Sequence, residues 1–229
     1  MFPDPAGNLR LKDALCDLLA TVSFVQRVIL FGSFAQERAD RWSDIDLLVV
    51  TINRLQFWEL LTLLVQHKPI VWRGLFVPQY PPSGGNVLGI VFEGESVFHN
   101  VDLNFMTLAE YHTPDALTRF GTAKEVYATA APVSNVDDGV ISMAEVQHPD
   151  NRRIFEGLHF TKKAIKRILR GQSAHDELRQ RSDQLRHILN DYPPDVESPY
   201  GKIGWLAHQY LAMAETLLTD STRNTPALS

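Results

Sequence analysis

Residues 27–50 read RVILFGSFAQERADRWSDIDLLVV. This segment holds two apolar runs of strand length and composition, RVILFG and SDIDLLVV, with a polar stretch between them. The residues from Ser33 to about Arg38 follow the first run and are expected to form a helical turn. We therefore predict a strand that ends at Gly32, a short helical turn and a second strand.

Two aspartates lie close together in the second run. Asp44 and Asp46 are separated by one residue, so on a strand both side chains lie on the same face of the sheet. Neighbouring carboxylates repel unless a cation neutralises them, and Mg²⁺ binds carboxylate oxygens and fills its shell with water and phosphate. A third carboxylate on a neighbouring strand would allow two ions to bind about 4 Å apart. Asp102 in NVDLNF is the best candidate, with Glu93 and Glu95 as alternatives.

Gly32 and Ser33 occupy the junction between the first strand and the helical turn. Backbone N–H groups and the Ser33 hydroxyl at such a junction can bind a phosphate, and glycine lets the backbone approach closely. The simpler interpretation of the aspartates is a solvent-exposed strand end. Asp102 could likewise point outward from an edge strand, because alternation predicts a face of the sheet but not the register.

The segment GSFAQERADRWSDIDLLV resembles the signature of the polymerase-beta-type nucleotidyltransferase superfamily. In that signature, Gly-Ser is followed by Asp-x-Asp after about ten to twelve residues. One departure is Glu37, which stands where many members carry glycine. The matched positions are Gly32, Ser33, Ala35, Ser43, Asp44, Ile45 and Asp46.

The resemblance implies an α+β fold with a mixed sheet flanked by helices. It implies that Gly32 and Ser33 bind the triphosphate of an NTP, which serves as co-substrate. Asp44 and Asp46 would both bind the same two Mg²⁺ ions. Asp102 would be the third metal ligand or the base toward an acceptor hydroxyl, or both.

The sequence patterns in the rest of the chain indicate two domains. Helical spacing begins at Asn8 and ends near Ser23, and recurs in FWELLTLLVQ. Two strands joined by a tight turn are expected in VLGIVFEG and SVFHNVDLNFMT, a short helix in TPDALTRFG and a strand in AKEVYAT, whereas PPSGG and APVSNVDDG are typical of loops. From Asp150 onward the pattern is helical. We predict a nucleotidyltransferase catalytic domain over residues 1–147 and an α-helical C-terminal domain over residues 148–229.

Four basic residues share one segment of the predicted helical domain. They could reach the triphosphate, but a charged helix face is usually solvated, and that is the expectation here. The four residues are Lys162, Lys163, Lys166 and Arg167.

Composition narrows the class of protein. The hydrophobic content of 45% is enough for a packed core, and the formal net charge of -5 argues against a chain that binds nucleic acid along its surface. The single cysteine, Cys16, leaves no pair for an internal disulfide. No apolar run has membrane-spanning length, and MFPDPAGNLR lacks the order of a signal peptide. We expect a soluble cytoplasmic protein.

A short catalytic domain followed by helices is similar to the antibiotic nucleotidyltransferases that modify aminoglycosides or lincosamides. The leading hypothesis is Mg²⁺-dependent transfer of a nucleoside monophosphate from an NTP to a hydroxyl of a small-molecule acceptor, with antibiotic resistance as the setting. One alternative is transfer of AMP to a partner protein, as in antitoxin-like enzymes. Another is a catalytically inactive nucleotide-binding module. A homodimer that shares the site between subunits would fit the resemblance.

Overall fold

The computed structural model describes residue 4 and residues 6–76, 86–129, 149–196 and 201–223. The chain splits into two compact units, Met1–His148 and Pro149–Ser229, here called the amino-terminal unit and the helical unit. Among the described helices, none combines the length and the apolar character that crossing a bilayer requires.

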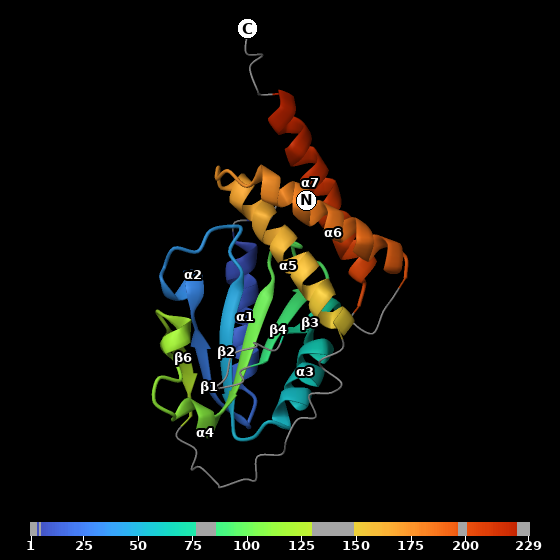
Figure 1. The fold of residues 1–229 in the computed structure, drawn as a ribbon. Coiled ribbons are helices and arrows are strands. Elements are labelled where there is room, and N and C mark those ends of the chain that lie inside the picture. Colours follow the sequence, from blue (N-terminus) through green and yellow to red (C-terminus); the bar gives the residue numbers. More distant parts are fainter. Residues whose placement is uncertain (1–3, 5, 77–85, 130–148, 197–200, 224–229) are drawn as a thin grey trace. The chain divides into compact units, whose positions relative to one another are not determined.

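The amino-terminal unit is built on a six-stranded sheet with the strand order β3-β4-β5-β2-β1-β6 (Figure 1). Only β2 and β5 pair in parallel, and the other neighbours are antiparallel, so the expected mixed sheet is confirmed. The elements in chain order are α1 (Gly7–Ala20), β1 (Val25–Leu30), α2 (Gly32–Ala35), β2 (Ile45–Thr51), α3 (Gln56–His67), β3 (Ile70–Phe76), β4 (Asn86–Phe92), β5 (Val101–Thr107), α4 (Leu108–Tyr111), the 3₁₀ helix η1 (Thr118–Phe120) and β6 (Lys124–Ala128).

Helices α1 and α3 pack on one face of this sheet and form the main core. Alternate residues of β2 point into it, and so do residues spaced by four along α1, as the amphipathic pattern requires. The core includes Leu11, Leu15 and Leu19 from α1, Phe57, Leu60 and Leu64 from α3, and Ile45, Leu47 and Val49 from β2. The burial of this face determines which side chains of β2 point the other way.

The opposite face of β2 and β5 divides into an apolar half and an acidic half. Leu48, Val50 and Met106 lie in a smaller cluster that also contains Leu108 of α4. Asp46 and Asp102 are an even number of residues from these side chains, so they lie on the same face at the beginning of their strands. The fold therefore places two carboxylates beyond the edge of a small apolar cluster.

The helical unit consists of α5 (Pro149–Leu169), α6 (His175–Asp191) and α7 (Ile203–Arg223) (Figure 1). Two glycines allow close packing within it: a Cβ on Gly157 would lie 2.5 Å from Ile188 Cδ1, and one on Gly204 would lie 1.9 Å from the Tyr192 carbonyl oxygen. The buried apolar residues include Ile154, Leu158, Ile165, Leu178, Leu185, Leu206 and Tyr210. The α+β class, a mixed-sheet unit followed by helices, is as expected.

Two local predictions need correction. The edge strand β3 was not predicted from the sequence, although it pairs with β4 over its whole length. Residues 96–100 were expected to extend the following strand, but the His99 N–H donates to the Ser96 carbonyl oxygen in a turn, and β5 begins only at Val101. The predicted loops PPSGG (81–85) and APVSNVDDG (131–139) lie outside the described residues.

Candidate active site

The end of β1 brings Gly32 against the side chain of Asp46. The Phe31 N–H donates to the Asp46 backbone carbonyl oxygen at 3.1 Å, which continues the β1–β2 ladder by one residue. Gly32 then adopts φ +64°, and a Cβ built on it would lie 2.2 Å from Asp46 Oδ2. Two independent reasons therefore require glycine at position 32: the left-handed backbone conformation and the carboxylate of Asp46, which occupies the space of a Cβ.

Asp46 and Asp102 are direct neighbours across the parallel pair β2–β5. Residues in register on adjacent strands have side chains on the same face, with backbones about 4.8 Å apart. Both side chains are partly exposed, and Asn100 Nδ2 donates a hydrogen bond to Asp102 Oδ1. The structure thus brings together these two of the three predicted acidic residues.

Asp44 lies one residue before β2 begins and is partly exposed. The next residue, Ile45, donates its N–H to the Asn100 carbonyl oxygen at 2.9 Å and has a fully buried side chain. The position of Asp44 therefore depends on the start of the ladder on one side and on the preceding turn on the other.

That preceding turn, residues 40–43, is held by its own polar groups. Ser43 Oγ accepts from the Asp40 N–H at 2.9 Å and donates to Asp40 Oδ1 at 3.0 Å, and the Trp42 N–H donates to the same Oδ1 at 2.9 Å. Ser43 is 4% exposed. The serine of the matched signature thus shapes the turn before Asp44.

The short helix α2 follows Gly32 directly. Gln36 and Arg38 donate their N–H groups to the carbonyl oxygens of Gly32 and Ser33 at 3.2 and 3.0 Å, which closes the expected helical turn. Glu37 adopts φ +55°, a left-handed conformation that favours glycine, and its side chain is exposed 3.9 Å from Lys124 Nζ. The departure from the family pattern is accommodated by a strained backbone with the side chain in solvent.

The donor set fits magnesium better than a softer ion. Across the described parts of the chain, no three His, Cys, Asp or Glu side chains form a ready-made metal site. Asp46 and Asp102 nevertheless supply carboxylate oxygens from adjacent strands, and Mg²⁺ binds through one or two carboxylates while water and substrate phosphates complete its shell. The metal roles of Asp44, Asp46 and Asp102 remain predictions.

One feature of the site and one feature of the helical unit were not anticipated. Asn100, the hydrogen-bond partner of Asp102, lies two residues before it, and strand alternation could have suggested that both share a face. In the helical unit, Lys162 and Lys166 are each only 3% exposed, so the expected solvated helix face is wrong for them.

Residues 9–74 match the family model described as "Nucleotidyltransferase domain". The matched segment runs from α1 into β3 and includes Gly32, Ser33, Asp44 and Asp46. Residues 9–74 are therefore similar to the nucleotidyltransferase domains that this family model describes. The model describes such domains in general, so an antibiotic acceptor stays a prediction.

Solved structures that are similar to this chain have low sequence identity to it. A chain of the GLD-2/RNP-8 complex is 20% identical (TM-score 0.35, 45% of this chain and 43% of that chain). A cytoplasmic RNA terminal U-transferase is 22% identical (TM-score 0.30, 43% and 29%). The STING-associated CdnE c-di-GMP synthase from Capnocytophaga granulosa is 14% identical (TM-score 0.31, 95% and 81%). The matched part is less than half the length of the first two chains. A search of curated protein sequences gives no match.

Proposed function

We propose that this protein transfers a nucleoside monophosphate from a Mg²⁺-bound NTP to a hydroxyl group of a small molecule and releases pyrophosphate. The observation that supports the proposal is the pairing of Asp46 with Asp102 across β2 and β5. This pair lies beside Gly32, which has no side chain. Two carboxylates on one sheet face, next to a turn of backbone N–H groups, match the needs of a metal-bound triphosphate.

In the proposed reaction, the acceptor oxygen attacks the α-phosphorus of the NTP. The bond between the α-phosphorus and the α–β bridging oxygen breaks, and pyrophosphate leaves with that electron pair. Asp44, Asp46 and Asp102 would hold two Mg²⁺ ions, which supply charge stabilisation for the attacking and leaving oxygens. Asp102 would alternatively accept the proton of the acceptor hydroxyl, and Gly32 and Ser33 would hold the triphosphate.

The charge of the chain supports a small acceptor over a nucleic acid. The formal net charge is -5, whereas a protein that follows a phosphate backbone needs a surplus of Lys and Arg on one face. Which hydroxyl compound is modified depends on residues outside the motif, and an antibiotic is one member of the proposed class.

Calorimetric titration tests the proposal before any acceptor is known. The full chain is titrated with each of the four NTPs in Mg²⁺ and in EDTA, alongside an Asp44→Asn/Asp46→Asn double variant. A matched control is Thr51→Val, which removes a buried hydrogen bond to the Asn53 carbonyl oxygen at the other end of β2. We expect metal-dependent binding of an NTP that the double variant loses and the control keeps. Absence of NTP binding with any metal would overturn the catalytic proposal.

A further inference from the structure

The turn that leads to Asp44 is held by Asn8 and His99, two side chains from distant parts of the sequence that are here called the braces. Asn8 Nδ2, in the first turn of α1, donates to the Asp40 carbonyl oxygen at 2.7 Å. His99 Nε2 lies 3.2 Å from the Arg41 carbonyl oxygen and must donate to it, because a carbonyl oxygen only accepts. Consecutive carbonyl groups of one turn are thus held from two directions.

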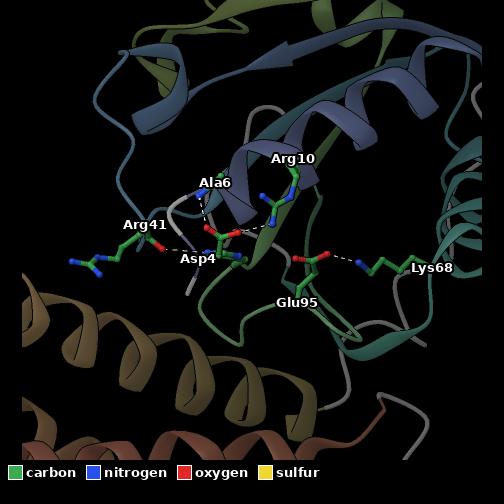
Figure 2. Close-up of polar contacts among 7 residues, drawn as sticks. Asp4, Ala6, Arg10, Arg41, Lys68 and Glu95 are labelled. Atoms are coloured by element: carbon green, nitrogen blue, oxygen red, sulfur yellow. Dashed lines mark hydrogen bonds and ion pairs between the residues drawn. The ribbon is translucent and has the colours of Figure 1, made fainter. Parts of the chain in front are cut away.

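The braces are buried, although the first two residues of the turn are exposed. Asn8 and His99 are 3% and 1% exposed, whereas Asp40 and Arg41 are exposed. In Figure 2 the Arg41 carbonyl carries a dashed hydrogen bond while its guanidinium points away from the cluster. Two buried polar side chains therefore bind the backbone of Asp40 and Arg41, the exposed half of the turn, and not a helix or strand.

The braces are themselves fixed in place. A Cβ on Gly7 would lie 2.9 Å from His99 Cε1, so the start of α1 rests directly on the imidazole ring. Figure 2 shows Asp4 bound to Arg10 and to the Ala6 N–H at this end of α1, and the Arg10 hydrogen bond lowers the pKa of Asp4. The ring of the preceding residue, Phe98, packs edge-on against Trp42 of the turn, with 5.4 Å between ring centroids.

We propose that His99, together with Asn8, is a positioning residue that sets the carboxylate of Asp44 for metal binding. The inference rests on the proposed function, because it assumes that Asp44 is a metal ligand. The geometry favours it because Arg41 is three residues before Asp44, and the ladder begins only at Ile45. The braces thus add to the hydrogen bonds that Ser43 and Trp42 make within the turn before Asp44.

The test compares Mn²⁺ affinities of the full-length chain without nucleotide, measured from the EPR signal of free Mn²⁺. His99→Ala removes the donor, and His99→Gln restores an amide N–H that can reach the Arg41 carbonyl. Mutation of residues that hold metal ligands in place typically lowers metal affinity 10- to 100-fold. We therefore expect His99→Ala to weaken Mn²⁺ binding about 10-fold and His99→Gln to regain most of the affinity. The NMR signal of the Trp42 indole N–H should shift in His99→Ala and return in His99→Gln.

Thr51→Val separates positioning from general loss of stability, since it removes a buried hydrogen bond far along the same strand. An equal loss of Mn²⁺ affinity in Thr51→Val, or unchanged affinity in His99→Ala, would overturn the inference. If His99→Ala does not fold, Asn8→Ala tests the second brace with the same expected loss and the same contradicting result. If Asp44→Asn/Asp46→Asn also binds Mn²⁺ like the wild type, the proposed function itself is wrong.

Discussion

Gly32 and Asp46 lie so close together that a Cβ on Gly32 would come within 2.2 Å of the Asp46 carboxylate. The contact joins the turn after β1 to the first acidic residue inside β2. It gives a physical reason for the glycine of the matched signature, since any side chain there would displace the carboxylate.

Gly32→Ala should damage the site beyond the strain that it introduces. A left-handed residue other than glycine costs about 1–2 kcal/mol, and the displaced carboxylate should weaken metal-dependent NTP binding at least 10-fold. Gly121→Ala is a matched control, because Gly121 has φ +63° and a Cβ there would meet nothing within 4 Å. Calorimetry and thermal unfolding check both variants. Equal NTP affinities in the two variants would contradict this view of the contact.

Asn100→Ala should impair the site without removing a carboxylate. Asn100 Nδ2 donates to Asp102 Oδ1, and loss of that bond removes one restraint on the orientation of the carboxylate. We expect metal affinity to fall about 10-fold. The measurement is an Mn²⁺ titration of Asn100→Ala beside Asp102→Asn. Wild-type affinity in Asn100→Ala together with lost affinity in Asp102→Asn would show that the orientation of Asp102 is set elsewhere.

Glu37→Gly should stabilise the protein. The residue has φ +55°, and relief of this backbone strain is worth about 1 kcal/mol. Its ion pair with Lys124 spans 3.9 Å between exposed side chains and contributes little. Thermal unfolding should therefore show a higher midpoint, with NTP affinity unchanged. A lower midpoint would mean that the glutamate side chain makes a stabilising contact that outweighs the strain.

Cys16 should be slow to alkylate at neutral pH. Burial raises the pKa of its thiol from 9.0 to about 11, so the reactive thiolate is depleted below that pH. The two-unit difference (11 minus 9.0) corresponds to about 100-fold less thiolate at pH 8 than in an ordinary cysteine. Mass spectrometry after iodoacetamide treatment, with and without urea, measures the rates. Equal rates at pH 8 would contradict the burial of the thiol.

The sequence predicts the parts of this fold that depend on local patterns. Residues 27–50 contain the strand, turn and strand, and the apolar spacing of α1 and α3 follows from the core that they cover. The pairing of Asp46 with Asp102 could not be predicted from a local pattern. Alternation predicts the face on which Asp102 lies, but the parallel register of β2 and β5 depends on the whole sheet.

The missed features depend on contacts between distant segments. β3 is an edge strand whose sequence, IVWRGLF, lacks strict alternation, and its pairing with β4 defines it. The place of His99 depends on its contact with Gly7 at the start of α1, and its imidazole lies beside a carbonyl of another loop. No local pattern contains this information.

The shared metal site is tested most directly by a double-mutant cycle on Asp46 and Asp102, read out as Mg²⁺-dependent NTP affinity by calorimetry. If the two carboxylates hold the same metal-bound triphosphate, Asp46→Asn and Asp102→Asn should each abolish most of the affinity. The double variant should then be hardly worse than either single variant, because residues that share one ligand are not additive. Fully additive losses, or wild-type affinity in either single variant, would contradict a shared metal site on β2 and β5.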